Sequence, residues 1–316
     1  MITIAFLFSF LLVKSYIPIN ARWTQHGLTV AGGYGRGKAT NQLNWPEGLF
    51  VDDDQTMLIV AHGVDRIIQW KKDDMNGQVV TGGQGEGTRL NQFNCPTDVL
   101  IDKEMDSLII CDLGNRRAMQ WSHRSGTTQG EILISNIDCY GLAMDDKRNL
   151  YVSDTDKHEV RRYQIGDNKG TLVAGGHGKG ARLNQLNQPK YLFADRQQAV
   201  YVSDHGNHHV MKWDKDATEK IIIAAGQSEG NALTQLNHPN ELFTDTLGVL
   251  YVADTANDRV MRWPEGAKEG TAIVGGNGCG KAANQLTRPM GLSFDRNGNL
   301  YVVDYGNDRV QRFSTK

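Results

Sequence analysis

The segment NQLNQPKYLFAD at residues 184–195 recurs along the chain, with intervals of 50 residues between most copies. Each copy is followed by a short apolar run and then by an Asn- and Arg-rich turn. A period of this size indicates a fold built from repeated units. The other copies are NQLNWPEGLFVD at 41–52, NQFNCPTDVLID at 91–102, TQLNHPNELFTD at 234–245 and NQLTRPMGLSFD at 284–295.

Six units can be aligned on the proline that precedes the first apolar run, which we call the anchor. A shorter third unit, SNIDCYGLAMDD, carries Cys139 at the anchor position. An aspartate stands six residues after every anchor, which supports the count of six. The anchors are Pro46, Pro96, Cys139, Pro189, Pro239 and Pro289.

Each unit reads as four short strands separated by Gly- and Asx-rich turns, which is the pattern of one propeller blade. No unit carries a sustained helical period. The chain begins with an unpaired fourth strand, LTVAGG at 28–33, and ends with a third strand, DRVQRF at 308–313. The sequence therefore predicts an all-β, six-bladed β-propeller, closed by an N-terminal strand that pairs with the C-terminal blade and leaves no open edge.

The apolar stretch MITIAFLFSFLLV at residues 1–13 has the length of a signal-peptide core and is too short to span a bilayer. Ser15 or Ala21 can end a cleaved segment. We therefore expect a signal peptide over 1–21, a propeller over 22–316, a secreted protein, and no membrane span in the mature form. An uncleaved membrane anchor and a buried N-terminal segment are the alternatives.

The blade motif P-x-G-L-x-x-D…L-Y-V-x-D-x-x-N-x-R-V-x-R-W resembles the NHL repeat. The triplets nearest to Asn-His-Leu are NRR at 115–117, NHH at 207–209 and NDR at 257–259 and 307–309. The resemblance implies that the first strands run down a central channel. It also implies that the GGxGxG…NQLN loops and the Asn-rich turns share one face, here called the loop face. Such a face is the expected binding surface, because loops on a rigid scaffold carry variation.

The position after the anchor differs most between units, and an active site is normally asymmetric. It carries Glu47, Thr97, Tyr140, Lys190, Asn240 and Met290, and we call these six residues the channel mouth. Related calcium-dependent lactonases use an Asn or Asp here. Asn240 and Glu47 fit that pattern, with Asp98 and Glu241 one residue further along and Tyr191 beside Lys190. Lys190 argues against calcium, because its ammonium repels a cation or pairs with the carboxylate.

Histidines offer a second site hypothesis, with His158, His205, His208 and His209 expected on adjacent blades of the loop face. Zinc can use three imidazoles and keep an open position. A peptidylglycine-amidating lyase is a related six-bladed zinc enzyme, but the channel mouth carries no histidine. His208 also occupies a turn position where NHL repeats often have histidine for local hydrogen bonding.

Aspartates end the second strand of five units, with His62 as the expected exception, and they are predicted to accept N–H groups of the following turn. Cys111 is expected to be a small buried residue, and Cys279 a free thiol in an exposed loop. A disulfide between Cys95 and Cys139 is possible. The short third unit is expected to leave a notch lined by Tyr140 and Cys139.

A non-catalytic recognition module that binds a protein or peptide on the loop face is the function favoured by the sequence, with no cofactor and no metal. The first alternative is a metal-dependent lyase or lactonase at the channel mouth. The second is binding of single-stranded RNA, which needs a basic face with aromatic side chains. The net charge of −2 and the absence of Lys/Arg runs longer than two disfavour nucleic acid. The loop face would mix Arg36, Lys38, Arg89, Lys179 and Arg182 with Glu47, Glu86, Asp98 and Glu241.

Overall fold

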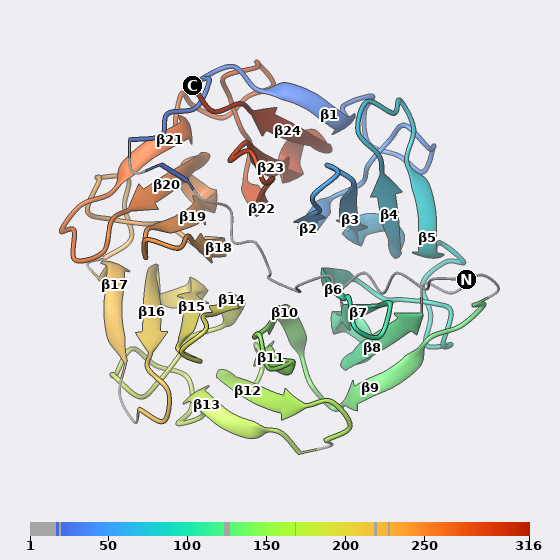
Figure 1. The fold of residues 1–316 in the computed structure, drawn as a ribbon, viewed down its shortest axis with the longest axis horizontal. Helices are drawn as coiled ribbons and strands as arrows, with labels where there is room; N and C mark the ends of the chain where they lie inside the picture. The colour runs from blue at the N-terminus through green and yellow to red at the C-terminus, as the bar shows by residue number, and fades with distance from the viewer. Residues whose placement is uncertain (1–16, 19, 123–126, 168, 218–219, 227) are drawn as a thin grey trace, which may run out of the picture.

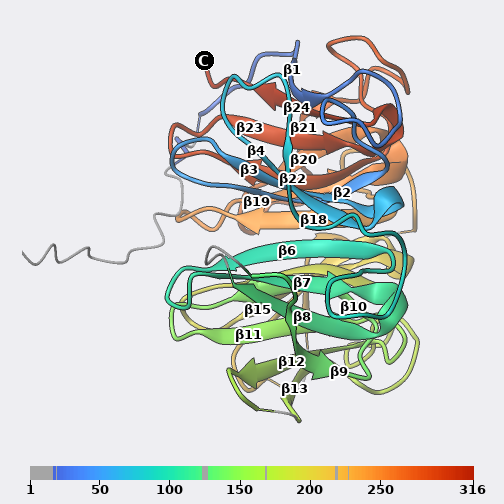
Figure 2. The same cartoon turned by 90° about the vertical axis from the view of Figure 1, so that its right-hand side faces the viewer.

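Six four-stranded antiparallel sheets form a closed ring in the computed structural model (Figure 1). The structure describes residues 17–18, 20–122, 127–167, 169–217, 220–226 and 228–316. Figure 2 shows the same ring from the side. The chain is therefore an all-β six-bladed β-propeller, and this sequence prediction is confirmed.

Each repeat unit supplies the strands of one blade in sequence order, from the channel outward. Blades 1 to 3 contain β2 (Pro46–Val51), β3 (Met57–Ala61), β4 (Arg66–Trp70), β5 (Gln78–Gly82), β6 (Pro96–Asp102), β7 (Ser107–Asp112), β8 (Arg117–Ser122), β9 (Glu131–Ser135), β10 (Cys139–Met144), β11 (Asn149–Asp154), β12 (Glu159–Gln164) and β13 (Thr171–Gly175). Blades 4 to 6 contain β14 (Pro189–Ala194), β15 (Val200–Asp204), β16 (His209–Trp213), β17 (Ile221–Ala225), β18 (Pro239–Thr244), β19 (Leu250–Asp254), β20 (Arg259–Trp263), β21 (Thr271–Gly275), β22 (Pro289–Phe294), β23 (Leu300–Asp304), β24 (Arg309–Phe313) and β1 (Leu28–Gly32).

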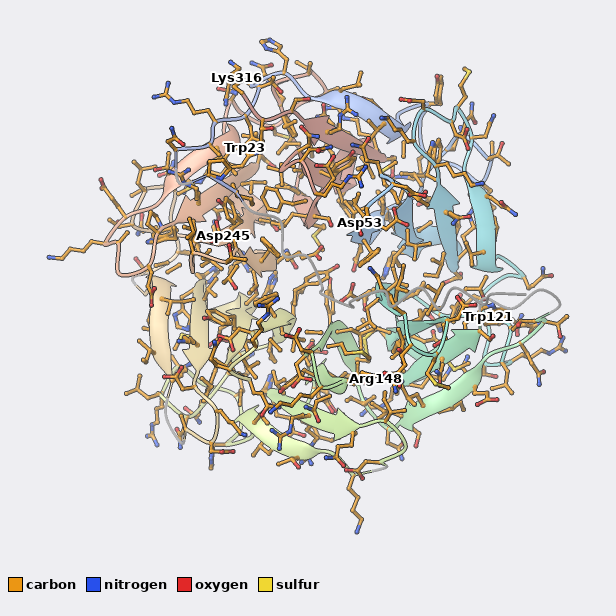
Figure 3. The ribbon with its side chains drawn as sticks, viewed as in Figure 1. Trp23, Asp53, Trp121, Arg148, Asp245 and Lys316 are labelled. Carbon is orange, nitrogen blue, oxygen red and sulfur yellow. A yellow bond between two sulfur atoms is a disulfide. The ribbon has the colours of Figure 1, made fainter. Side chains whose placement is uncertain are left out.

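The two ends of the propeller meet in blade 6, as the sequence predicts. The outer strand β1 pairs antiparallel with β24, with Leu28 opposite Arg312 and Gly32 opposite Arg309. Figure 3 places Trp23 and Lys316 at this blade, where the Lys316 amide donates to the Arg22 carbonyl at 2.8 Å. The ring is therefore closed by backbone hydrogen bonds between its first and last strands.

The core lies between neighbouring blades, where the two faces of each sheet pack against the next sheet. The aromatic residue that ends each third strand is buried, with no more than 6% of its surface exposed. Truncating a buried Phe or Trp costs about 3–5 kcal/mol, so each of these side chains is a large contribution to the stability of its blade. They are Trp70, Trp121, Tyr163, Trp213, Trp263 and Phe313.

The predicted signal peptide lies mostly in residues 1–16, outside the described residues. Two residues of the predicted segment are described and buried, since Ile17 is fully buried and Ala21 is 9% exposed in the cluster that contains Trp23. Cleavage after Ser15 would preserve this packing, whereas cleavage at Ala21 would remove it. The only helices among the described residues are the 3₁₀ turns η1 (His62–Val64), η2 (Leu113–Asn115), η3 (His205–Asn207), η4 (Thr255–Asn257) and η5 (Tyr305–Asn307). None of them is long and apolar enough to cross a membrane.

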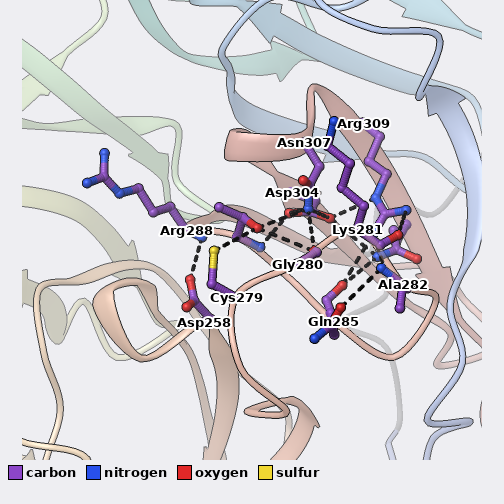
Figure 4. Close-up of polar contacts among 12 residues, drawn as sticks. Asp258, Cys279, Gly280, Lys281, Ala282, Gln285, Arg288, Asp304, Asn307 and Arg309 are labelled. Carbon is purple, nitrogen blue, oxygen red and sulfur yellow. Dashed lines mark hydrogen bonds and ion pairs between the residues drawn. The ribbon is translucent and has the colours of Figure 1, made fainter.

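A buried aspartate at the end of the second strand ties the loop face together, as Asp304 shows (Figure 4). Its carboxylate accepts the Thr287 amide at 2.7 Å, the Asn307 side chain at 2.9 Å and the Arg309 Nε at 2.7 Å. In blade 6 this amide belongs to the preceding long loop, whereas in blade 3 Asp154 accepts the Lys157 amide of the following turn at 3.0 Å, as predicted. Asn307 also donates to the Gly280 carbonyl at 2.8 Å, so the loop and the turn do share one face.

Blade 1 is the exception in this series, but His62 does not occupy the aspartate position as predicted. In the strand register Ala61 is paired with Arg66 exactly where Asp304 is paired with Arg309. His62 comes one residue later, at the start of η1. The segments MLIVAH and NLYVVD both end in a polar residue, which suggests that His62 matches Asp304. The strand register shows that Ala61 does.

The cysteines also pair differently from the prediction. A disulfide joins Cys111 of β7 to Cys139 of β10, whose Cα atoms are 5.2 Å apart, within the usual range. Cys111 therefore faces blade 3 and is not only a small core residue, while Cys95 is a free thiol outside the core. Cys279 is an exposed free thiol, as predicted. Cys139 and Tyr140 are buried, so neither lines an open notch.

Candidate functional site

The six channel-mouth residues lie at the start of the innermost strands, which surround the central axis in Figure 1. The structure places each of them on a different blade, and the blades bring Glu47, Tyr140 and Lys190 together. Tyr140 donates its hydroxyl to Glu47 Oε2 at 3.0 Å, and Lys190 Nζ donates to the Tyr140 oxygen at 3.1 Å. The Lys190 ammonium also lies 4.5 Å from the centre of the Tyr140 ring. Three residues from blades 1, 3 and 4 thus form one network.

Burial governs the ionisation of this network. It raises the pKa of the Glu47 carboxyl, and His62, Lys190 and Tyr140 oppose that rise. It lowers the pKa of Lys190, while Glu47 opposes that fall. It also raises the pKa of Tyr140 well above its usual value, helped by Glu47. The carboxylate and the ammonium therefore depend on each other for their charges.

His62 adds a fourth member to this network from blade 1. Its Nδ1 lies 3.0 Å from the Pro96 carbonyl and 3.7 Å from Glu47 Oε1. Because a carbonyl only accepts, Nδ1 carries the proton. That proton is donated to the Pro96 carbonyl, and the imidazole lies beside the Glu47 carboxylate without a hydrogen bond to it.

Asp98 and Glu241 each lie one residue after a channel-mouth residue, and the carboxylate of each accepts a hydrogen bond from the next blade. Asp98 accepts the Leu142 amide at 2.8 Å and Glu241 accepts the Leu292 amide at 2.8 Å. Burial raises the pKa of Asp98 to about 7 and the pKa of Glu241 well above its usual value. Tyr191 donates its hydroxyl to the Thr97 carbonyl at 3.2 Å and packs edge-on against Tyr140. Asp98 and Glu241 therefore join adjacent blades, and Tyr191 joins blade 4 to blade 2.

Asn240 is fully buried and separate from the Glu47 network. Its amide nitrogen donates to Thr255 Oγ1 at 2.7 Å, while its Oδ1 has no hydrogen-bond partner among the described residues. Such a buried orphan oxygen is unusual in a folded protein. This oxygen is therefore available as a metal ligand.

The channel mouth does not fit calcium, which needs six to eight oxygen ligands. Glu47 is bonded to Tyr140, and its other neighbours are the cationic Lys190 and the imidazole of His62. Among the described His, Cys, Asp and Glu residues, Glu47, Asp98 and Glu241 do not converge within 4.8 Å. The ammonium of Lys190 supplies a positive charge where a lactonase-like site would hold its metal.

The predicted histidines lie on blades 3 and 4, and His238 precedes the first strand of blade 5 beside them. His205 Nδ1 lies 3.1 Å from the Pro239 carbonyl, and burial lowers the pKa of His205 to about 3. Its ring packs edge-on against His238, and so does the ring of His208. The three imidazoles therefore form one edge-on cluster.

His208, His238 and Glu229 are the only group of three potential metal ligands within 4.8 Å among the described residues. The hydrogen bonds at His208 oppose a metal. Its Nδ1 accepts the His238 amide at 3.2 Å, so the proton of the neutral ring must lie on Nε2, 3.5 Å from Glu229. Coordination through Nε2 would require that proton to move to Nδ1 and break this bond.

The bond from His208 belongs to a series that links every blade to the next, which we call the latch. In five blades, the residue after the 3₁₀ turn, or after the equivalent turn of blade 3, has a left-handed backbone. Its side chain accepts a hydrogen bond from the backbone amide of the residue before the next anchor. The acceptor and donor pairs are Asp65 and Cys95, His158 and Gln188, His208 and His238, Asp258 and Arg288, and Asp308 and Trp45. Between blades 2 and 3 the polarity is reversed, because Arg116 donates to the Asp138 carboxylate at 2.7 Å.

The residues held by the latch form a ring around the channel mouth, which we call the pre-anchor ring. Five of them have φ between 46° and 52°, although they precede proline. Non-glycine residues rarely adopt this conformation, and such strain persists where the surrounding structure imposes it. The members are Trp45, Cys95, Asp138, Gln188, His238 and Arg288, of which Trp45, Gln188 and Arg288 are exposed.

Trp45 is the largest exposed member of the ring and lies between two partners. Its ring stacks on Tyr305 with centroids 6.3 Å apart and planes 9° apart, and the Arg36 guanidinium lies 4.9 Å from its centre. Arg36 is fixed in turn by Asp308, 3.2 Å away, which also holds the Trp45 amide. Trp45 is 40% exposed. We call Trp45, Arg36 and Tyr305 the Trp45 patch.

A groove of about 800 Å³ begins at Arg36 and Asp308 and follows β1 to the hairpin that joins β4 to β5. Its walls mix charge with exposed apolar side chains, since Tyr34 is 59%, Leu28 57% and Met75 71% exposed. The patch and the groove therefore form a continuous surface across the junction of blades 6 and 1.

The position after each anchor, which the sequence favours as a binding site, is largely buried in the structure. The exposed counterpart is the residue before the anchor, one step away in the same motif. Its variation from Trp to Cys, Asp, Gln, His and Arg was visible in the repeats. The latch that aims these side chains was not visible, because it joins residues of different blades.

Comparisons with known proteins agree with this architecture. The NHL repeat family matches residues 286–313. No curated protein matches the sequence.

Solved structures resemble the chain at low sequence identity. An auxiliary nutrient binding protein from Bacteroides thetaiotaomicron has a TM-score of 0.72 and 14% identity, covering 94% of this chain and 77% of that one. A gluconolactonase from Xanthomonas campestris has a TM-score of 0.64 and 14% identity, covering 94% and 95%. Virginiamycin B lyase from Staphylococcus aureus has a TM-score of 0.57 and 11% identity, covering 93% and 99%. At these identities the likeness concerns the fold alone, since a fold hosts many functions.

Proposed function

Since the chain is an NHL-repeat β-propeller, we propose that it is a non-catalytic binding module whose loop face holds a protein or peptide ligand. The Trp45 patch is the observation that carries this proposal. Trp, Tyr and Arg are the side chains most enriched at energetic hot spots of protein interfaces. Here one of each is partly exposed, Tyr305 stacks on Trp45, and Asp308 of the latch holds Trp45 and Arg36, so little side-chain entropy remains to be lost on binding.

The channel mouth supports the same proposal, because its ionisable groups are already engaged with one another. Glu47 is held by Tyr140 and flanked by Lys190 and His62, and the two deeper carboxylates accept backbone amides. A general base or metal ligand must be able to reach a substrate. These side chains instead join the blades, which gives the loop face a rigid base.

Secretion fits this role and is part of the proposal. The disulfide between Cys111 and Cys139 is typical of proteins that mature in an oxidising compartment. Among the similar structures, one is named as a nutrient binding protein and others as a lactonase or a lyase. Both kinds of activity are therefore compatible with this fold.

The proposal is tested by affinity capture from extracellular material with three proteins: the wild type, Trp45→Ala and Leu247→Ala. Leu247 is 45% exposed in the turn between β18 and β19, on the face opposite the loop face, and is a matched control. A protein partner held by the wild type and Leu247→Ala but lost by Trp45→Ala supports the proposal. Equal retention by all three contradicts it. If RNA is captured instead, with an affinity that falls steeply with salt, the nucleic-acid alternative replaces it.

A metal-dependent lyase or lactonase remains the second candidate, favoured by the orphan Oδ1 of Asn240. It predicts that a chelator lowers the melting temperature and that one added ion restores it. A ligand at 100 times its dissociation constant stabilises by about 2.7 kcal/mol. A melting temperature unchanged by chelator, calcium and zinc rejects this candidate.

A further inference from the structure

Blade 1 lacks the buried carboxylate that organises the loop face of the other blades. In blades 2, 4, 5 and 6 this carboxylate accepts a loop amide at 2.7 Å. In blades 2, 5 and 6 it also accepts an arginine Nε at 2.7 Å. Blade 1 has Ala61 at this position, and Val64 where blade 6 has Asn307.

The arginine of blade 1 is nevertheless retained and occupies the same place as its counterparts. Arg66 donates from Nη1 to the Lys38 carbonyl at 3.0 Å and from Nη2 to the Ala39 carbonyl at 3.4 Å. Arg309 makes the same two contacts with the Lys281 and Ala282 carbonyls at 3.0 and 3.2 Å (Figure 4). Arg309 Nη2 also donates to the Gln285 carbonyl at 3.2 Å, but the main difference between the two guanidinium groups is the carboxylate that faces the Nε of Arg309.

Among the residues that the structure describes, none supplies a counterion for the buried charge of Arg66. The residue is 8% exposed, and its Nε is buried with no hydrogen-bond partner among the described residues. Burial is the sole cause of the lowered pKa of Arg66, with no contribution from a nearby carboxylate. A guanidinium stays protonated in a protein, and a buried unpaired charge is strongly destabilising.

The repeat assigns a second donor to the same position. The Asn44 amide is the blade 1 equivalent of the Thr287 amide, which donates to Asp304. With alanine at position 61, the Asn44 amide has lost that acceptor, just as Arg66 Nε has lost its own. Two donors, one of them charged, are thus assigned to the position where the other blades have an aspartate carboxylate. Ala61 offers only a methyl group there.

We propose that a small monovalent anion, of the size of chloride, binds between Arg66 Nε and the Asn44 amide in place of the missing carboxylate. The anion would neutralise the guanidinium and satisfy both donors, as Asp304 does in blade 6. A bulky anion is excluded, because the site is buried and Val64 occupies part of the space. The stability of blade 1, and with it the geometry of the adjacent Trp45, would then depend on the halide concentration.

The experiment is thermal unfolding of the full chain at constant ionic strength, with sodium chloride replacing sodium gluconate. The melting temperature of the wild type is expected to rise with chloride, by about 3 °C at ten times the dissociation constant. Ala61→Asp supplies the carboxylate covalently, so it should melt higher in gluconate and respond at most weakly to chloride. Arg66→Met removes the charge and should also lose the response, which keeps the test decisive if Ala61→Asp does not fold.

Bromide supplies a direct readout, because its anomalous scattering locates it in a crystal. A bromide peak beside Arg66 Nε in the wild type, absent in Ala61→Asp, supports the proposal. A water molecule in that position, together with a melting temperature that does not respond to chloride, overturns it. An equal chloride response in all three proteins also overturns it, because the effect would then arise elsewhere.

Discussion

Replacing Asp308 by alanine tests how the latch supports both the fold and the binding surface. Asp308 has a left-handed backbone, with φ of 53°, and is 6% exposed. It accepts the Trp45 amide at 3.0 Å and fixes Arg36 at 3.2 Å. Alanine would remove both contacts and place a side chain with no local hydrogen bond in a conformation that disfavours it.

The expected loss of stability can be assembled from these two effects. A left-handed backbone costs roughly 1–2 kcal/mol for an ordinary residue, and Asp tolerates it better than Ala. An amide left without its acceptor costs about 1–3 kcal/mol when buried, and less here because Trp45 is partly exposed. The sum is about 2–3 kcal/mol, measured as the change in the free energy of unfolding by urea. Asp308→Asn keeps a side-chain acceptor and should lose much less.

Asp258→Ala is the matched control, because Asp258 holds the Arg288 amide at 2.8 Å with φ of 54°. It should lose similar stability but leave the Trp45 patch intact. Affinity for the loop-face ligand should therefore fall with Asp308→Ala and not with Asp258→Ala. A loss of stability below about 0.5 kcal/mol for Asp308→Ala would refute the latch, and equal affinities would refute its link to binding.

Three further perturbations have definite expected outcomes. Reducing the disulfide between Cys111 and Cys139, which closes 28 residues, should lower the free energy of unfolding by roughly 3–4 kcal/mol, measured in urea with and without reductant. The pKa of His205 falls from 6.5 to about 3 on folding, so the unfolded chain binds the proton more tightly and stability is lost as the pH falls below about 6.5. His205 alone contributes a loss of about 2 kcal/mol between pH 7 and pH 5, which is the expected difference in pH dependence between the wild type and His205→Gln; identical pH dependence in the two proteins would contradict it. Phe313→Ala should cost about 3–5 kcal/mol, because Phe313 is fully buried where the ring closes, and calorimetry would measure it as a lower melting temperature.

The repeats were sufficient to predict the number of blades, their strand order and the closure through β1. This succeeds because each strand and turn recurs six times, so the pattern at Pro46 to Asp52 is checked by five others. The same averaging hid the exceptions. Ala61 was read one residue out of register, because only the pairing with Arg66 reveals which residue replaces the aspartate.

The candidate site was predicted less completely, since contacts between blades depend on the closed ring. The sequence placed Glu47, Tyr140 and Lys190 around the channel mouth and predicted that Lys190 pairs with a carboxylate there, but it did not predict that the Tyr140 hydroxyl links the two by hydrogen bonds. Cys111 and Cys139 lie 28 residues apart on different strands, and only the packing of β7 against β10 brings them together. Trp45 was present in the motif, but its backbone amide is held by Asp308, which lies at the other end of the chain. The sequence alone does not bring these two residues together.

The central claim is that the loop face binds its ligand through the Trp45 patch. The most direct test is the dissociation constant of the captured partner, measured by calorimetry for the wild type, Trp45→Ala and Leu247→Ala. Loss of a hot-spot residue costs at least about 2 kcal/mol, which is about a 30-fold weaker affinity. We predict that weakening for Trp45→Ala and an unchanged affinity for Leu247→Ala. Equal affinities for the three proteins would contradict the claim.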